Sequence, residues 1–589
     1  MILDKINNSK DVKLLTIDEM TALAEEMREL IIKKVNTIGG HMAPNLGIAE
    51  ATIALHYVFN LPSDKIIYDV SHQCYPHKIL TGRKEGFTDP DKYLKYTGYT
   101  APEESEYDLF KIGHTSTSVS LAAGVAKARD LKGEKYNVIA LIGDGSLSGG
   151  EALEGLDNAA VLNSNIIIIV NDNEMSIAEN HGGLYGNLKQ LRETQGQAEC
   201  NMFKALGFDY MYVENGNNVQ DLINAFSRIK DTNKPTVVHI HTLKGKGLAQ
   251  AENDKETFHF TMPGILDTKP ENIQTSTEDY TSITKDFISA KIKSDKNAIV
   301  IAAGTPGVFG FDKKYRQEMG SQYTDVGIAE EHAVAYASAL AKSGAKPIFT
   351  VMSSFIQRTY DQLSQDLGLN NSPITMLVYW GGISNADATH LCTFDIPLIS
   401  NIPNLVYMSP TNKEEYLAML EYAYNQNEHP TAIRVPAAEL ISTGTPDTTD
   451  YSKINKYKVI SKGSKIAILG LGNFFNLAVE VKDELISKYG INPTLINPIY
   501  TTGIDRELLE SLKQDHELVI TLEDGCLDGG FGEKISRFYG NSDIKTLNFG
   551  AEKEFSDRVP LEELYNRYHL TKELIIKDIQ NTLKERICK

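Results

Sequence analysis

Short β-branched runs that alternate with helix-patterned segments constrain the fold of this chain more than any other feature. The run at 165–172, NIIIIVND, is apolar from Ile166 to Val170 and then turns polar. A strand that is apolar on both faces is typical of a parallel sheet covered by helices on both sides. Similar runs occur at 65–71, 136–145 and 236–242, and a helical-period segment lies at 116–131. The first third of the chain is therefore predicted to be an α/β domain.

The same alternation recurs twice further along the chain. Strand candidates lie at 298–304, 346–352, 374–380 and 405–410 in a second block, and at 465–472 and 517–525 in a third. Polar segments without apolar periodicity are predicted linkers, at 262–284 and 442–456. Since 589 residues exceed what one hydrophobic core accommodates, we expect three successive α/β domains with mainly parallel sheets. Their expected bounds are 1–275, 285–445 and 455–589.

Composition excludes several classes of protein. The formal net charge of −19 repels phosphate backbones, so no nucleic-acid partner is expected. The chain has no apolar run long enough to span a bilayer and no N-terminal signal segment, so no membrane association is expected. Its five cysteines are scattered without a CxxC pair, which argues against a disulfide framework and a structural zinc site. We expect a reducing, cytoplasmic location.

Two neighbouring predicted strands end in polar groups that suit a bound ion. Asp144 follows one strand within Gly143-Asp144-Gly145, and Asn173 follows the next. The carboxyl ends of parallel strands meet at the edge of a sheet where ligands bind. A carboxylate and an amide oxygen suit Mg²⁺, and glycines allow close approach of a diphosphate. A magnesium-bound diphosphate is predicted here, although Gly-Asp-Gly alone is also common in ordinary strand–helix turns.

Other nucleotide signals are weaker. A P-loop is excluded because no Gly-Lys-Ser/Thr follows the first glycines. The turn Gly470-Leu471-Gly472 has Phe475 where a third glycine would stand, which favours a structural turn over a dinucleotide site.

Longer motifs lie at 38–59, 68–83, 113–120, 171–177, 325–334, 353–362 and 523–533. They follow one another through nearly the whole chain. These segments resemble those of transketolase-type thiamine diphosphate enzymes, and more closely the 1-deoxy-D-xylulose-5-phosphate synthase family. The resemblance implies a transferase that decarboxylates pyruvate, a 2-oxo acid, and adds the two-carbon unit to the aldehyde D-glyceraldehyde 3-phosphate. The product would be 1-deoxy-D-xylulose 5-phosphate, for isoprenoid, thiamine and pyridoxal biosynthesis. Thiamine diphosphate, Mg²⁺ and a homodimer are also implied.

The resemblance assigns roles to individual residues. Glu330 would bond the aminopyrimidine ring nitrogen; its neighbour Glu331 points another way, because consecutive helical residues do not share a face. The implied Mg²⁺ ligands are Asp144, Asn173 and the carbonyl of Met175. Cofactor contacts are implied for His72, Gly113, His114, Thr115, Gly145, Ser146, Lys244, Leu248 and the stacking ring of Phe355. The implied substrate-side residues are His41, His259, Arg358, Asp387 and His390, and histidines suit proton transfer near neutral pH.

The acceptor half departs from the family pattern. Trp380 and Ala437 stand where the family has arginines expected to bind the acceptor's phosphate, and the loop after residue 180 is shorter. Losing two charge-assisted hydrogen bonds of roughly 1.5–3 kcal/mol each would weaken binding about 10²- to 10⁴-fold. Two enzymatic hypotheses therefore stay open: a synthase with a rearranged acceptor pocket, and a carboligase or transketolase that uses a different, even unphosphorylated, aldehyde.

Two further alternatives belong to other classes. A non-catalytic cofactor-binding protein would need neither Glu330 nor His41. The hypothesis of a nicotinamide dehydrogenase depends on Gly470 and Gly472 alone. Whether each active site is built from one chain or two stays open.

Overall fold

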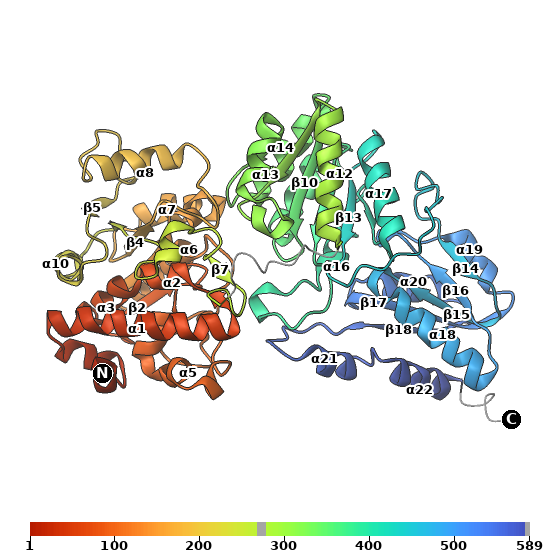
Figure 1. Cartoon of the computed structure of the whole chain (residues 1–589), viewed down its shortest axis with the longest axis horizontal. Coiled ribbons are helices and arrows are strands. Elements are labelled where there is room, and N and C mark those ends of the chain that lie inside the picture. The colour runs from red at the N-terminus through yellow and green to blue at the C-terminus, as the bar shows by residue number, and fades with distance from the viewer. Residues whose placement is uncertain (268–277, 584–589) are drawn as a thin grey trace. The chain divides into compact units, whose positions relative to one another are not determined.

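The computed structural model describes residues 1–267 and 278–583, which divide into two compact units (Figure 1). The first unit comprises residues 1–267 with Gly327–Ala329, and the second comprises residues 278–326 and 330–583. Within these ranges no helix combines the length and the apolar character that a membrane span requires.

A five-stranded, wholly parallel sheet lies at the centre of the first unit, in the order β2-β3-β4-β6-β5. Its strands are β2 (Lys65–Tyr68), β3 (Val138–Gly143), β4 (Ile167–Asp172), β5 (Asp209–Val213) and β6 (Thr236–His241). Along β4, Ile167 and Ile169 join one hydrophobic cluster, whereas Ile168 and Val170 join another. The continuous apolar run therefore fills two cores, one on each face of the sheet.

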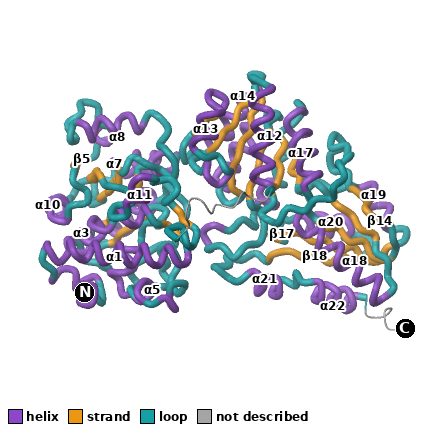
Figure 2. Tube along the Cα trace, viewed as in Figure 1, coloured by secondary structure: helices purple, strands orange, loops and turns teal. Residues whose placement is uncertain are grey.

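Helices cover this sheet, and a small antiparallel pair, β1 (Gly40–His41) with β7 (Phe260–Thr261), stands apart from it. The helices are α1 (Ile17–Ile38), α2 (Ala43–Gly47), α3 (Ala49–Val58), α4 (Tyr75–Lys78), α5 (Glu85–Thr88), α6 (Ser118–Leu131), α7 (Gly150–Ala160), α8 (Leu184–Glu193), α9 (Met202–Leu206), α10 (Val219–Ile229) and α11 (Ala249–Asn253). Figure 2 shows these helices around the strands of the sheet. The longest, α1, begins with a capping box between Thr16 and Glu19.

The second unit contains two sheets. The six-stranded sheet is parallel throughout, in the order β12-β13-β11-β10-β8-β9. Its strands are β8 (Ala298–Ala302), β9 (Tyr323–Asp325), β10 (Lys346–Met352), β11 (Thr375–Tyr379), β12 (Val406–Met408) and β13 (Thr431–Val435). The five-stranded sheet has the order β14-β16-β15-β17-β18, and only β14 is antiparallel to its neighbour. Its strands are β14 (Lys458–Ser461), β15 (Lys465–Gly470), β16 (Thr494–Asn497), β17 (His516–Cys526) and β18 (Lys545–Ala551).

The two sheets of this unit share one hydrophobic cluster, to which Val378 of β11 and Val519 of β17 both belong. The surrounding helices are α12 (Tyr280–Ser294), α13 (Lys313–Met319), α14 (Glu330–Lys342), α15 (Tyr360–Gln362), α16 (Asp395–Ile399), α17 (Lys413–Asn425), α18 (Phe475–Tyr489), α19 (Arg506–Leu512), α20 (Phe531–Tyr539), α21 (Leu561–Arg567) and α22 (Lys572–Thr582).

Every strand that the sequence predicted is present, and the fold class of successive α/β domains with mainly parallel sheets is confirmed. The predicted linker at 262–284 is wrong at its end, because α12 begins at Tyr280 with a capping box between Asp279 and Ser282. Residues 268–277 of that prediction lie outside the described residues. The segment 442–456 contains no helix or strand, and the domain bounds themselves stay predictions.

Candidate active site

Three histidines that the sequence singled out lie together in the first unit. His41 is on β1, His259 directly precedes β7, and His72 follows β2. The ring centroid of His41 lies 5.1 Å from that of His72 and 5.6 Å from that of His259. The ring centroids of His72 and His259 are 5.4 Å apart. Burial and the nearby positive charge of Lys244 hold the pKa of His259 well below its usual value, so this ring is neutral.

A strained loop holds His72 in this cluster. Val70 and Ser71 have positive φ angles of 56° and 61°, which are uncommon for residues with side chains. Asp69, which begins the loop, accepts hydrogen bonds from the backbone amides of Ser116 at 2.8 Å and Ser118 at 3.0 Å. These contacts tie the loop to the chain that follows the predicted Gly113-His114-Thr115 turn.

Sequence reasoning missed Asp69. It directly follows β2 just as Asp144 directly follows β3, and the same pattern could have identified it. Burial raises the pKa of Asp69, and the hydrogen bonds that it accepts oppose that rise.

The predicted ion site lies at the ends of β3 and β4, which pair with Gly143 opposite Asn171. Asp144 is buried and accepts a hydrogen bond from Asn180 at 2.8 Å. Burial and then the nearby carboxylate of Asp172 raise the pKa of Asp144 to about 7. Asn173 Oδ1 is buried and accepts no hydrogen bond. A buried carboxylate and an unsatisfied amide oxygen fit a divalent cation, which would stabilise the ionised form of Asp144.

Among the described residues no group of three or more His, Cys, Asp or Glu side chains could hold a metal ion. The predicted ligand set is of a different kind, because it combines a single carboxylate with an amide oxygen and a backbone carbonyl. Met175 forms an isolated antiparallel bridge with Glu179, and its role as a carbonyl ligand stays a prediction.

The loop after β3 requires a glycine. A Cβ on Gly145 would lie 2.7 Å from Ser176 Oγ and 2.9 Å from Ser176 Cα. The two chain segments that follow β3 and β4 are therefore in contact at this point. Ser146 is buried beside Gly145, and its carbonyl accepts a hydrogen bond from Ser116 Oγ at 2.8 Å.

Lys244 lies against the same segments. It is buried, and its Nζ donates to the carbonyl of Ser176. Burial lowers the pKa of Lys244 to about 7, and the charge of Asp144 opposes this effect. An anion at this point would restore the protonated form of Lys244. Leu248, by contrast, packs against the hydrophobic core, and its cofactor contact stays a prediction.

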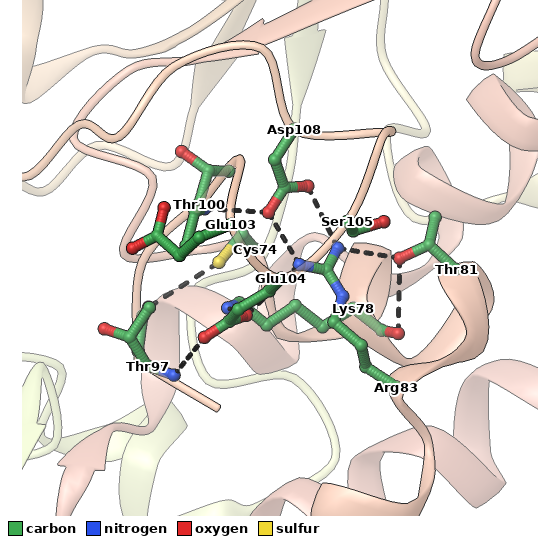
Figure 3. Close-up of polar contacts among 12 residues, drawn as sticks. Cys74, Lys78, Thr81, Arg83, Thr97, Thr100, Glu103, Glu104, Ser105 and Asp108 are labelled. Carbon is green, nitrogen blue, oxygen red and sulfur yellow. Dashed lines mark hydrogen bonds and ion pairs between the residues drawn. The ribbon is translucent and has the colours of Figure 1, made fainter. Parts of the chain in front are cut away.

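A buried ion cluster, also missed by sequence reasoning, fixes the long loop that leads to Gly113 (Figure 3). Asp108 accepts two hydrogen bonds from Arg83, at 2.6 and 2.9 Å, and one from His77 at 3.0 Å. Glu104 pairs with Lys78 on α4. The cluster thus joins the loop to α4 and the turn that follows it, and His77 takes part in it as a structural residue.

The predicted residues of the second unit also gather around one another. Glu330 begins α14 and is only 3% exposed. Its Oε2 accepts no hydrogen bond, and Arg358 Nη1 lies 3.8 Å away. Burial raises the pKa of Glu330 to about 7, whereas the guanidinium of Arg358 lowers it. Glu331 is not buried, so only one of the two carboxyl groups is enclosed, as the helix geometry predicted.

Phe355, Asp387 and His390 form the second part of this group. The rings of Phe355 and His390 meet edge to face at 5.9 Å. Asp387 accepts a hydrogen bond from Thr389 Oγ1 at 2.8 Å, and that hydroxyl lies 2.9 Å from His390 Nδ1. Burial lowers the pKa of His390, while Asp387 raises it.

The positions that depart from the family pattern lie at the ends of β11 and β13. Trp380, the only tryptophan of the chain, is 39% exposed and has a φ of 63°. Arg434 is buried and donates to Asp395 at 2.7 and 3.1 Å and also to Asp524. Because both of its neighbours are carboxylates, Arg434 cannot replace the missing arginine at Ala437.

The glycines that suggested a dehydrogenase have packing roles instead. A Cβ on Gly470 would lie 2.6 Å from Ala478 Cβ, and one on Gly472 would lie 2.1 Å from Ser409 Oγ. The turn after β15 is therefore closely packed against the protein itself.

Comparison with known sequences identifies the family. Family models match residues 3–201 and 194–242 (1-deoxy-D-xylulose-5-phosphate synthase), 277–441 (transketolase, pyrimidine binding domain) and 455–575 (transketolase, C-terminal domain). The 1-deoxy-D-xylulose-5-phosphate synthase of Carboxydothermus hydrogenoformans is 36% identical over 625 aligned positions, covering 99% of both chains. The chain belongs to the 1-deoxy-D-xylulose-5-phosphate synthase family. The synthases of Caldanaerobacter subterraneus and Francisella tularensis are also 36% identical, each over 99% of both chains.

Membership of the synthase family makes the chain a transketolase-type transferase. A solved transketolase from Campylobacter jejuni is 16% identical over 96% of this chain and 99% of its own, with a TM-score of 0.44. That score is too low to support a conclusion. The predicted residues fall into one group in each unit: the histidines, Asp144, Asn173 and Lys244 in the first, and Glu330, Arg358, Phe355, Asp387 and His390 in the second.

Proposed function

We propose that this chain is a thiamine diphosphate-dependent synthase that joins pyruvate and D-glyceraldehyde 3-phosphate to give 1-deoxy-D-xylulose 5-phosphate and CO₂. The observation that carries the proposal is Glu330, a buried carboxyl group with an unsatisfied oxygen at the start of α14. Its pKa of about 7 lets it hold a proton at neutral pH, as a donor to a ring nitrogen must.

Residues of the first unit would hold the charged end of the cofactor. We assign Mg²⁺ to Asp144, Asn173 and the carbonyl of Met175, because Asn173 Oδ1 has no hydrogen-bond partner and Asp144 is buried. Lys244 would offer its positive charge to the diphosphate. When bound, thiamine diphosphate supplies the electron sink for decarboxylation and carbon–carbon bond formation.

The histidines supply the proton transfers. His259 Nδ1 is buried without a hydrogen-bond partner, and we propose that it receives the proton of a substrate hydroxyl, while burial lowers the pKa of the ring and favours onward release of that proton. His41 and His72 lie within 5.6 Å of His259. On the acceptor side, we propose that His390 exchanges a proton with the aldehyde oxygen, with its ring oriented by Thr389 and Asp387.

A second candidate function differs in the acceptor. Trp380 offers a partly exposed aromatic surface at the end of β11, and an aromatic surface favours an apolar or unphosphorylated aldehyde over a phosphate dianion.

We also propose a homodimer, by analogy with the family, and a cytoplasmic location. The latter is supported by free cysteines at 74, 200, 392 and 526.

The test is a reaction with defined donors and acceptors. Purified protein with thiamine diphosphate, Mg²⁺ and [1-¹⁴C]pyruvate should release CO₂ faster when D-glyceraldehyde 3-phosphate is added, and mass spectrometry should detect the five-carbon product. Stimulation by unphosphorylated aldehydes alone would favour the second candidate. Cofactor binding without turnover of any 2-oxo acid or ketose would refute both enzymatic candidates.

A further inference from the structure

The loop that carries two proposed substrate residues follows β11 of the six-stranded sheet. It is attached both to that sheet and to the five-stranded sheet of the second unit. We call residues 382–394 the acceptor loop; it contains Asp387 and His390. The amide of Gly382 donates to the carbonyl of Cys392 at 2.9 Å, which closes the loop at its base. Ser353, at the end of β10, donates to the same carbonyl at 3.0 Å.

Two further backbone contacts of the acceptor loop come from the last residue of β17 and from the segment that follows β18. The amide of Cys526 donates to the carbonyl of Thr393 at 2.9 Å. The amide of Arg558 donates to the carbonyl of Ala386, also at 2.9 Å. The end of β17 and the loop between β18 and α21 therefore both bind the acceptor loop through the backbone.

Asp557 completes the turn that presents His390. Three successive backbone amides open this turn. The amide of Ala388 donates to Asp557 Oδ1 at 3.2 Å. The amides of Thr389 and His390 donate to Asp387, to its Oδ1 at 3.0 Å and to its carbonyl at 2.8 Å. Asp387 satisfies the second and third amides from within the loop. Only the first depends on a distant part of the chain.

We propose that the C-terminal domain acts in the reaction as a clamp on the acceptor loop, with Asp557 as a positioning residue for Asp387 and His390. This inference rests on the proposed function of those two residues. Loss of the Asp557 hydrogen bond frees the Ala388 amide and widens the range of orientations of the His390 ring. Since small misplacements of a reacting group cost up to about 10²-fold in rate, one lost hydrogen bond should cost about 10-fold.

The experiment compares Asp557→Ala with Asp557→Asn, which keeps an oxygen that accepts from Ala388. Asp312→Ala is the control, because Asp312 is an exposed carboxylate that likewise accepts a backbone hydrogen bond, from Tyr315 at 2.8 Å at the start of α13. Asp557→Ala should lower kcat/KM for the acceptor about 10-fold, with thiamine diphosphate affinity unchanged. Asp557→Asn should keep most of the wild-type kcat/KM, and Asp312→Ala should leave kcat/KM unchanged.

Hydrogen–deuterium exchange supplies a readout that does not depend on activity. In the cofactor-free protein, peptides from the acceptor loop should exchange faster in Asp557→Ala than in wild type or Asp312→Ala. Wild-type exchange and wild-type kcat/KM in Asp557→Ala would overturn the inference, as would equal impairment by Asp557→Asn. If the wild-type protein forms no product with any acceptor, the proposed function fails, while the exchange comparison still decides whether the clamp exists.

A second variant covers the case in which Asp557→Ala unfolds. Phe555 is 79% exposed, and its ring meets Phe394 at 6.0 Å, so Phe555→Ala should fold. It should accelerate exchange of the acceptor loop in the same direction, and unchanged exchange in a folded Phe555→Ala would then overturn the inference.

Discussion

Glu330 should destabilise the cofactor-free protein at neutral pH, and the substitution Glu330→Gln tests this. The side chain is 3% exposed, and burial raises its pKa from 4.5 to about 7. The folded protein therefore binds the proton of the Glu330 carboxyl group more tightly than the unfolded chain does. The resulting contribution to stability is fully present below pH 4.5 and is lost as the pH rises through about 7.

The magnitude follows from the size of the shift. Each pKa unit corresponds to about 1.4 kcal/mol, so a rise from 4.5 to about 7 corresponds to roughly 3 kcal/mol. Glutamine does not ionise, so Glu330→Gln should be more stable than wild type by up to about 3 kcal/mol at pH 8 and by almost nothing at pH 4.5. For domains of this size, the gain corresponds to an increase in Tm of roughly 5–10 °C.

The assay is thermal unfolding of the cofactor-free proteins at pH 4.5, 6 and 8, combined with turnover of the loaded enzymes. Glu330→Gln should melt at a higher temperature than wild type at pH 8 and lose at least about 10²-fold in turnover, because an amide cannot exchange a proton with the ring nitrogen. Glu331→Gln serves as the control, since its side chain is not buried. A Tm difference that does not change with pH would refute the reasoning, and unchanged turnover would remove Glu330 from the proposed site.

Three further outcomes are expected. Asp144→Ala should weaken Mg²⁺-dependent binding of thiamine diphosphate at least about 10²-fold in calorimetry, and equal affinity with and without Mg²⁺ in the wild type would contradict the assignment. Arg434→Met leaves the buried carboxylates of Asp395 and Asp524 without their cation, so it should destabilise the second unit by about 3–5 kcal/mol in denaturant unfolding. Trp380→Arg should lower KM for D-glyceraldehyde 3-phosphate about 10-fold without changing KM for its unphosphorylated analogue. A parallel change in both KM values would show that no phosphate lies near this position.

Sequence patterns predicted the strands well where they were apolar and long. The runs at 138–143 and 167–172 have enough β-branched residues to identify β3 and β4. Among the described residues, the sequence did not identify β1, β5, β7, β9, β13, β14, β16 or β18. In β5, Asp209–Val213 is mixed in polarity, and in β9, Tyr323–Asp325 has only three residues. β5 and β9 form because a neighbouring strand, β6 or β8, pairs with each of them.

Part of the site could be predicted because some of its residues directly follow strands that the sequence identifies. Asp144 and Asn173 could be identified because each directly follows a recognisable strand. Asp69 follows β2 in the same way and could have been identified too, but only the structure shows that it accepts hydrogen bonds from the distant amides of Ser116 and Ser118. The contact between Asp557 and Ala388 is more distant still, and no local pattern indicates it.

The sequence by itself determined the α/β alternation, the polar groups at the ends of β3 and β4, and the family to which the chain belongs. These depend on periodicity and on the identity of adjacent residues, which act over a few positions. Only the tertiary structure decided that His41 and His259 lie together through the pairing of β1 with β7, and that burial brings the pKa of Glu330 to about 7. Such properties arise when distant segments exclude water from the same space, and no short stretch of sequence contains both partners.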